Sequence, residues 1–251
     1  MWLLCWRRAV VGVPCAGMPG PRRRSVLIAR LAGEHRDSSQ AAILAELRRC
    51  LLDGGVPPGT PIPLDEVATV FGVSVIPVRE SLKTLIGEGL VEHRPNLGYT
   101  VAKLTPAELR EMYLVREVLE TAALTAALRR ADASADEAVR AAHAAMARAV
   151  DEGDAAAFHR ESRGFHLALV RPCGMRRLLS MFESAWNITE PLQSMTHLAP
   201  AERAALQRDH DQILAAFLAR DEETLLTVAR AHHTGLRTAL DSVPSDTGLF
   251  A

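Results

Sequence analysis

The chain has 251 residues, of which 48% are hydrophobic and 24% charged, and its 29 basic and 30 acidic side chains nearly cancel. This length and balance are typical of one small and one medium folded domain. The four cysteines have neither metal-site nor disulfide-framework spacing, which excludes a disulfide-built scaffold and favours a cytoplasmic protein in which Cys50 and Cys173 are buried thiols.

The first 36 residues are predicted to form a disordered extension. Its apolar start is interrupted by Arg7 and Arg8 and is too short to span a membrane. A secretory signal would carry its positive charge before the apolar stretch rather than inside it. Two alternatives stay open: translation starts at Met18, or the three arginines at 22–24 form an arm that touches DNA phosphates.

Charge is distributed unevenly along the chain. Residues 1–103 carry a net charge of +4, and the remainder carries −5. This asymmetry is expected of a nucleic-acid-binding module followed by an acidic partner domain. Most of the positive excess lies in the N-terminal extension, so we expect modest affinity per DNA-binding head and two heads on one palindromic site.

Two helices are predicted after the extension. The first spans residues 40–52, and its apolar face consists of Ile43, Leu44, Leu47 and Leu51. The second spans residues 64–71, follows Pro63, carries two carboxylates in its first turn and ends at Gly72. Its apolar stripe consists of Leu64, Val67, Ala68 and Phe71.

A third helix is predicted directly after this turn. Ser74 is a suitable N-cap, Pro77 falls in the first turn, where its missing N–H costs nothing, and the helix ends at Gly87. The predicted buried face consists of Val78, Leu82, Leu85 and Ile86, and the other face carries Arg79, Ser81 and Lys83. Two helices joined by a glycine-containing turn are typical of the helix-turn-helix, whose second helix enters the DNA major groove.

Two short strands are predicted to form a wing beside these helices. They span residues 90–93 and 99–103, and Pro95 and Gly98 mark the turn between them. The sequence therefore predicts a winged helix-turn-helix DNA-binding domain over residues 37–103.

From Thr105 onward the pattern is helical, with helices predicted over residues 105–131, 134–151, 154–171, 175–197, 200–219 and 221–242. Capping boxes at Thr105 and Ser134 begin the first two helices, and Pro191 should kink the fourth. Because no strand pattern intervenes, residues 104–243 are predicted to form an all-α six-helix bundle with short antiparallel connections. Residues 244–251 are predicted to be a flexible tail, and the fold class is mainly α.

Three histidines mark a candidate site in the bundle. His166, His210 and His232 lie on three different predicted helices, each within an apolar stripe, so they could converge in the interior. Neutral imidazole is the commonest transition-metal ligand, but spacing alone also allows packed core histidines. A metal-dependent hydrolytic enzyme is another alternative, although Glu161 is a poor general base. The histidines predicted to lie at the surface or to pack are His143, His159, His197 and His233.

The run from Asp53 to Val101 resembles the winged helix-turn-helix of the GntR family of bacterial transcription regulators. The matching motifs are Pro-Pro-Gly, Gly-Val-Ser and Pro-Val-Arg-Glu around the helices, and Glu-Gly-Leu-Val before the wing. The resemblance implies DNA contacts from the start of the third helix and from the wing tip. The predicted DNA-binding set is Ser74, Val75, Ile76, Arg79, Lys83, Arg94, Asn96 and Gly98.

Two positions of this set depart from the family pattern. Relatives commonly have arginine in place of Val75 and threonine in place of Ile76. Valine and isoleucine cannot donate a hydrogen bond to a guanine edge, although they can pack against a thymine methyl group. The preferred operator should therefore differ from the commoner ones.

Residues 105–242 resemble the six-helix form of the FCD effector domain found in FadR-type GntR proteins. The matching segments are Val-Arg-Glu-Val-Leu-Glu in the first helix and the segments around the three histidines. In this family three histidines and an aspartate hold a divalent metal such as zinc or nickel, which implies a metal site at His166, His210 and His232. Ser162 stands at the aspartate position, and a hydroxyl is a poorer ligand than a carboxylate, so the site should be weakened or completed by water or effector.

The resemblance also implies a small organic acid as effector, with Arg116 and Ser162 as the predicted effector-binding residues. Arg116 shares a helix face with Met112 and Leu119 and should point inward, where a guanidinium can hold a carboxylate in a bidentate fork. The alternative is an ion pair with Glu120, one turn along the same helix.

These expectations combine into a ligand-responsive transcription regulator, acting as a repressor, with no enzymatic activity and no membrane partner. A homodimer joined through the bundle presents two winged helices to a palindromic operator in double-stranded DNA. The acid changes DNA binding through its differential affinity for two arrangements of these heads. An effector-free architectural DNA-binding protein is the alternative.

Overall fold

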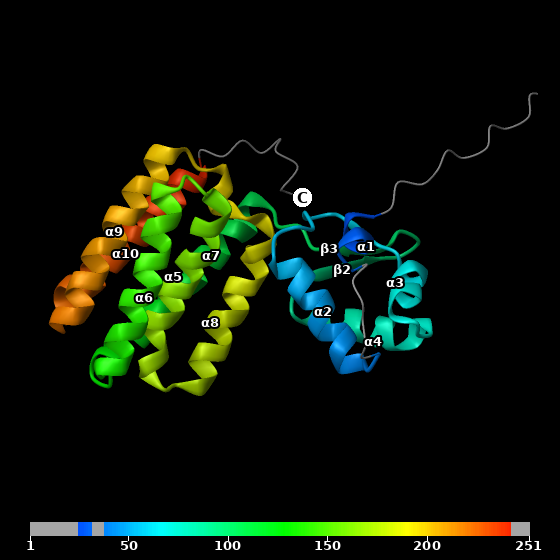
Figure 1. Cartoon of the computed structure of the whole chain (residues 1–251), viewed down its shortest axis with the longest axis horizontal. Helices are drawn as coiled ribbons and strands as arrows, with labels where there is room; N and C mark the ends of the chain where they lie inside the picture. Colours follow the sequence, from blue (N-terminus) through cyan, green and yellow to red (C-terminus); the bar gives the residue numbers. More distant parts are fainter. Residues whose placement is uncertain (1–24, 32–37, 242–251) are drawn as a thin grey trace, which may run out of the picture.

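The computed structural model describes residues 25–31 and 38–241, which form two lobes (Figure 1). The described part of the smaller, N-terminal lobe contains four helices and a small sheet, and that of the larger lobe contains six α-helices. The predicted mainly α fold, a winged helix-turn-helix followed by a six-helix bundle, is therefore confirmed.

The three predicted helices of the smaller lobe are α2 (Gln40–Leu52), α3 (Leu64–Phe71) and α4 (Val75–Gly87). The amphipathic stripes of α2 and α3 pack against α4 as their spacing predicts, and Gly72 turns the chain between α3 and α4 in the left-handed region, with φ 66°. The buried side chains that these helices share include Ile43, Leu47, Leu51, Val67, Phe71, Val78, Leu82 and Leu85.

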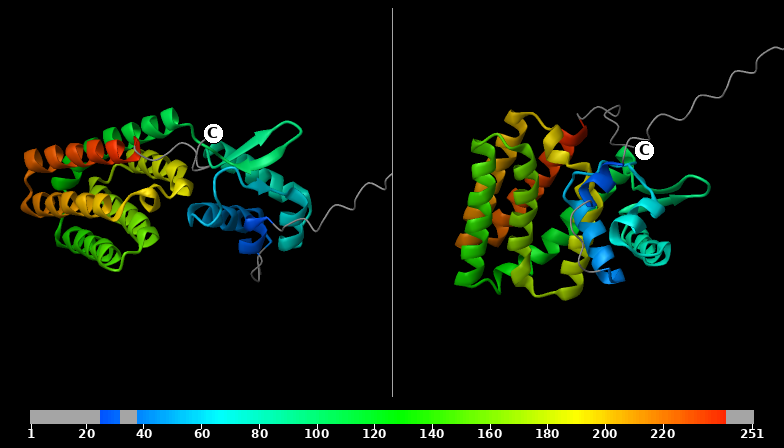
Figure 2. Two further views of the ribbon diagram at one scale, coloured as in Figure 1. Left: turned by 90° about the horizontal axis from the view of Figure 1, so that it is seen from above. Right: turned by 45° about the vertical axis from the view of Figure 1, so that its right-hand side comes forward.

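The sheet of this lobe consists of three antiparallel strands in the order β1-β3-β2. The hairpin of β2 (Val91–Arg94) and β3 (Gly98–Val101) is the predicted wing, and Figure 2 shows it projecting from the lobe. The strand β1 (Pro61–Ile62) pairs with β3 and was not predicted, because two residues are too few to carry a periodic pattern.

Two details of this lobe contradict the predictions. Residues Val26–Leu31 form helix α1, whose buried Leu27 and Leu31 join the core, so the prediction of disorder through residue 36 is wrong here. On α4 the predicted faces are wrong at two positions, since Ile86 is exposed and Ser81 is fully buried. The hydroxyl of Ser81 donates to the Pro77 carbonyl oxygen at 2.9 Å, which satisfies it inside the core.

Some expectations fall outside the described residues. The alternative start at Met18, the arginines at 22–24 and the predicted C-terminal tail at 244–251 belong to this group.

The larger lobe is a bundle of helices α5 (Pro106–Leu128), α6 (Ala133–Asp151), α7 (Ala155–Val170), α8 (Arg176–Thr189), α9 (Pro200–Ala219) and α10 (Glu222–Asp241). Helix α6 packs along α7 and α9, and α10 packs along α9 and α5. Large aromatic side chains fill the centre, namely Phe158, Phe165, Phe182, Trp186 and Phe217. As predicted, Cys50 and Cys173 are buried free thiols. Among the described helices, none is both long and apolar enough to span a membrane.

The predicted starts of the six bundle helices all lie within one residue of the observed starts. Thr105 and Glu108 form the predicted capping box of α5. Helix α6 begins one residue earlier than expected, because Asp132 rather than Ser134 is its N-cap. The Asp132 carboxylate accepts a hydrogen bond from the Ala135 N–H at 2.9 Å.

The prediction of one kinked helix over residues 175–197 is wrong. Helix α8 stops at Thr189, and two 3-10 turns follow, η2 (Glu190–Leu192) and η3 (Ser194–His197). Pro191 has no N–H to continue the helical ladder, and Gln193 adopts a left-handed conformation with φ 49°. The bundle therefore has a short irregular segment at this corner.

Candidate nucleic-acid interface and buried histidine cluster

The N-terminal end of α4 presents a mixed polar and apolar surface. Ser74 is the N-cap, and its exposed side chain makes no capping hydrogen bond within the described chain. The Ile76 side chain is 65% exposed, and Arg79, one turn further on, is also exposed. Val75 is only half-buried and packs against the core of the lobe. This end of α4 therefore offers a hydroxyl, an apolar side chain and a guanidinium to a ligand.

The wing lies next to this end of α4. Asn96 and Gly98 take left-handed conformations, with φ 65° and 85°, which hold the turn tight. Leu97 between them is 75% exposed. A surface groove of about 690 Å³ is lined by both Arg79 and Asn96, so the helix and the wing contribute to one continuous surface.

The other two predicted basic contacts have acidic neighbours. The Lys83 ammonium lies 2.8 Å from the Glu80 carboxylate, and an Arg94 nitrogen lies 3.2 Å from the Glu92 carboxylate. Exposed ion pairs of this kind contribute at most about 1 kcal/mol. Both cations can exchange their carboxylate for a phosphate at little cost.

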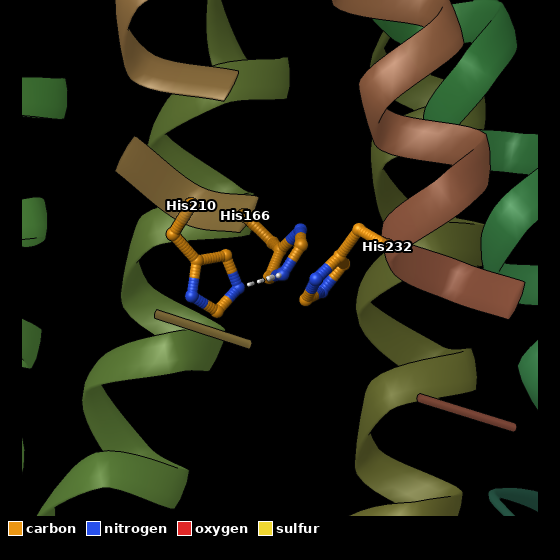
Figure 3. Close-up of side chains that lie close together, drawn as sticks. All are labelled: His166, His210 and His232. Atoms are coloured by element: carbon orange, nitrogen blue, oxygen red, sulfur yellow. Dashed lines mark hydrogen bonds between the residues drawn. The ribbon is translucent and has the colours of Figure 1, made fainter. Parts of the chain in front are cut away.

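The three predicted histidines converge inside the larger lobe. His166 on α7, His210 on α9 and His232 on α10 are all buried, and each offers a ring nitrogen within 4.8 Å of the others. Figure 3 shows the three rings facing one another, with Nε2 of His210 lying 3.3 Å from Nε2 of His166. Three imidazole nitrogens that point toward one common space form a donor set suited to a transition metal.

Burial favours the neutral form of two of these imidazoles, those of His210 and His232. It is the main cause that lowers the pKa of His210 well below its usual value, and it lowers the pKa of His232 to about 4. Positive charge on a neighbouring protonated histidine would lower both of these pKa values further. Neutral rings retain the lone pairs that metal binding requires.

A carboxylate that the sequence did not assign to the site orients two of its histidines. Glu120 on α5 is buried, with Oε1 2.6 Å from Nδ1 of His166 and Oε2 2.7 Å from Nε2 of His233. Although burial opposes its ionisation, these two imidazoles hold the pKa of the Glu120 carboxyl below its usual range. The contact to Nδ1 leaves Nε2 of His166 directed at His210, as expected for a second-layer carboxylate.

Arg116 points into the bundle, as predicted, but not toward its predicted alternative partner. It is 1% exposed, and its guanidinium lies 3.2 Å from the centre of the Trp186 ring and 4.6 Å from that of Tyr113. It donates a long hydrogen bond of 3.4 Å to the Thr189 hydroxyl. The ion pair with Glu120 is wrong, because that carboxylate is occupied by the histidines.

Burial lowers the pKa of the Arg116 guanidinium, while Tyr113, Glu120 and Glu190 oppose this shift. Arginine nevertheless stays protonated in proteins. The bundle therefore contains a buried positive charge that makes no ion pair with any carboxylate of the described chain.

The remaining predicted positions are divided between the interior and the surface. Ser162 is buried one turn before His166 on α7, on the face that its spacing predicts. His159 and His233 are fully buried and pair with carboxylates, so neither is a surface residue. His143 is half-buried beside Asp211, and His197 is exposed. Adjacency to a predicted ligand was the only sequence signal for His233.

Comparison with known proteins supports both lobes independently. Residues 39–101 match the model of bacterial regulatory proteins of the gntR family, and residues 111–235 match the FCD domain. The chain is 33% identical over 189 residues to a "probable D-xylose utilization operon transcriptional repressor" of Paenarthrobacter nicotinovorans, covering 73% of this chain and 80% of that protein.

Two solved structures share the fold. The regulator McbR of Escherichia coli is similar with a TM-score of 0.71 and 23% identity, covering 80% of this chain and 96% of that one. A GntR regulator from Rhodococcus sp. RHA1 gives a TM-score of 0.72 and 21% identity, covering 82% of this chain and 98% of that one.

Proposed function

Because the chain belongs to the GntR family of bacterial regulatory proteins and carries an FCD domain, we propose that it is a repressor released from its operator by a small organic acid. Members of this family are DNA-binding transcription regulators and not enzymes. This argues against the alternative of a metal-dependent hydrolytic enzyme. The FCD domain likewise argues against an effector-free architectural protein. We expect the regulator to act in the cytoplasm, where its DNA lies.

The observation that carries the choice of ligand is the buried charge of Arg116. A fully buried cation is costly unless an anion compensates it, and a carboxylate matches the planar guanidinium with two hydrogen bonds. Trp186 and Tyr113 hold the guanidinium in place by cation–π contacts. Such a preorganised cation is suited to bind the carboxylate of an effector.

The choice of repression over activation rests on relatives. The P. nicotinovorans protein is named a repressor of D-xylose utilization, and a Bacillus licheniformis relative, 36% identical over 86 residues, is named a gluconate operon repressor. Genomic fragments captured by the purified protein should share a palindrome, and a carboxylate should release them. Fragments without any shared sequence would contradict this proposal.

The same proposal includes a divalent metal held by His166, His210 and His232. The residues present fit such an ion, because all three are buried and directed at one another, and Glu120 orients His166. When bound, zinc or nickel would supply a Lewis acid that accepts an oxygen of the effector. Ser162 contributes no charge, so an oxygen of the effector would take the place of the aspartate ligand.

Replacing His210 with alanine should remove the metal without unfolding the bundle. One of three nitrogen ligands is lost, so we expect zinc affinity to fall at least about 10- to 100-fold, the range measured even for residues that only support a ligand. Elemental analysis and zinc titration of the purified full-length protein measure this. His197→Ala, which alters an exposed histidine, should keep one ion per chain. Equal zinc binding by both variants would refute the site.

A homodimer is the second structural element of the proposal. Helices α5 and α8 are neighbours, and both expose apolar side chains, including Val118, which is 60% exposed, and Met181, which is 61% exposed. Leu114 lies one turn from Val118, and a groove of about 560 Å³ lined by Met181 follows α8. A second copy is the expected occupant, since a palindromic operator requires two heads related by a two-fold axis.

Val118→Lys should convert this dimer to monomers. A lysine in an apolar interface brings a charge that is costly to bury, so we expect the dimer dissociation constant to rise by more than about tenfold. Sedimentation velocity measures the change, and operator affinity should fall with it. Val26→Lys, which adds the same charge to an exposed valine of α1, is the matched control. A Val118→Lys protein that stays dimeric would contradict the assignment of this surface.

The end of α8 offers a route from the effector to the DNA-binding lobe. Thr189 contacts Arg116, the Ile188 side chain lies against Gly89, and the Gln193 side chain fills the space beside Gly54. A carboxylate that binds Arg116 and shifts its guanidinium would therefore also shift the end of α8 and the turn after it, which contact both lobes. The effector changes DNA affinity only as far as it binds the two arrangements of this segment differently.

A further inference from the structure

A second group of buried polar side chains lies at the corner where α8 ends. His159 on α7, Glu190 in η2 and Ser194 in η3 are each more than nine-tenths buried. Neither the metal proposal nor the carboxylate contact to Arg116 uses them. Buried polar groups normally have hydrogen-bond partners, so each exception requires an explanation.

The polar atoms of this group lack hydrogen bonds within the described chain. Oε2 of Glu190, the Ser194 hydroxyl and both ring nitrogens of His159 are all buried without one. The closest approaches to Glu190 are 3.4 Å from Nε2 of His159 and 3.5 Å from Nη1 of Arg163. These contacts are attractive, but they do not have hydrogen-bond geometry.

A purely structural ion pair between Arg163 and Glu190 does not account for this arrangement. The guanidinium of Arg163 makes its short hydrogen bond, 2.6 Å, to the side-chain oxygen of Asn187. Glu190 therefore keeps a buried carboxylate oxygen that accepts no hydrogen bond, although the Arg163 guanidinium lies 3.5 Å away, and a buried acceptor without a hydrogen bond is costly. A ligand that supplies a hydrogen-bond donor would remove this cost.

This group is continuous with the effector contacts. Glu190 directly follows Thr189, whose hydroxyl accepts the hydrogen bond from Arg116. Ser162 and His166 follow His159 on the same face of α7, at intervals of three and four residues. The polar groups therefore form a buried strip that begins at the histidine cluster and ends at η3.

We propose that Glu190, His159 and Ser194 form a hydroxyl-binding subsite, so that the effector is a hydroxy acid rather than a simple monocarboxylate or a dicarboxylate. This inference rests on the proposed function, because it assumes that Arg116 holds the carboxylate of the same molecule. It adds the chemical class of the effector and three residues that select it.

The chemistry of the three side chains favours a hydroxyl over other groups. A hydroxyl donates to Oε2 of Glu190 and accepts from the Ser194 hydroxyl or from a His159 N–H, so it satisfies both kinds of partner. A methyl group at the same place satisfies neither. A second carboxylate would lie against the Glu190 carboxylate, and like charges in a buried site repel strongly.

The test compares matched acids on the full-length protein. Propanoate, butanoate and pentanoate are each titrated beside their monohydroxy isomers and the dicarboxylate of equal length, by calorimetry in the presence of zinc. We expect at least one hydroxy acid to bind at least about tenfold more tightly than its parent acid and its dicarboxylate, as sites built to bind a hydroxyl discriminate strongly. Equal binding within every set, or tighter binding of a dicarboxylate, overturns the inference.

Glu190→Gln and Ser194→Ala assign the preference to these residues. Each should reduce the ratio of hydroxy-acid to parent-acid affinity by at least about tenfold. Ser194→Ala keeps the test valid if Glu190→Gln fails to fold. An unchanged ratio in a folded variant overturns the subsite. If wild-type protein binds none of the carboxylates, the proposed function fails with it, whereas equal binding of all acids refutes only the hydroxyl-binding subsite.

Discussion

Arg116→Met is expected to abolish the response to carboxylates while the protein stays folded. Truncating one partner of a buried, hydrogen-bonded charge pair costs about 2–5 kcal/mol, which corresponds to an affinity loss of about 30-fold to several thousand-fold. Glu120, one turn along the same helix, keeps its contacts to His166 and His233 when Arg116 is replaced. Methionine retains much of the packing against Trp186 and Tyr113.

Two measurements separate this loss from general damage. Carboxylate titrations by calorimetry give the affinity, and thermal unfolding without ligand gives the stability, which should equal or exceed that of wild type because a buried charge is removed. Arg110→Met changes an exposed arginine of the same helix, paired with Asp241, and should leave the response unchanged. An Arg116→Met protein that still releases operator DNA on addition of carboxylate would exclude Arg116 from the effector site.

Arg79→Ala is expected to remove most of the preference for the operator. A bidentate arginine contact to guanine contributes about 1–3 kcal/mol of discrimination, and two heads of a dimer double it to about 2–6 kcal/mol. The Arg79 side chain is exposed at the groove between α4 and the wing and makes no ion pair with a described residue. Its removal should therefore leave the melting temperature unchanged.

The matched control for this variant lies one turn further along α4. Lys83→Ala should weaken binding to operator and to random DNA equally and should reduce the salt dependence of binding, because a lysine contact to phosphate carries no sequence information. Fluorescence anisotropy with both DNAs at several salt concentrations measures the two effects. If Arg79→Ala lowers both affinities to the same extent, Arg79 contacts the backbone and the specificity resides elsewhere, with Ile76 as the exposed neighbour.

Prediction from sequence was most accurate where several neighbouring residues indicated the same element. Helices α2 and α3 have the predicted ends because capping residues, a turn glycine and apolar spacing all agree. The convergence of His166, His210 and His232 followed from their places on apolar faces together with the family resemblance. The two-residue strand β1 and the six-residue helix α1 are too short to produce a pattern, and pairing with β3 and packing in the core stabilise them.

Side-chain partners were the least predictable feature. Glu120 lies one turn from Arg116, and helical spacing made an ion pair between them a reasonable alternative. In the folded bundle its two oxygens contact His166 and His233, which lie 46 and 113 residues away along the chain. This competition between a local and two distant partners is decided by how α5, α7 and α10 pack, and no local pattern records it.

The amino-acid sequence by itself determined the family, the order of the two lobes and the helix-turn-helix with its wing, because caps, turn residues and periodic apolar faces act over a few residues. Only the tertiary structure decided that Arg116 is a buried cation without an ion-pair partner among the described residues, that Glu190 lies beside His159, and that the η3 turn carrying Ser194 packs against α7. Their chemistry depends on desolvation and on distances between helices that are remote in sequence, and both arise only when the bundle closes.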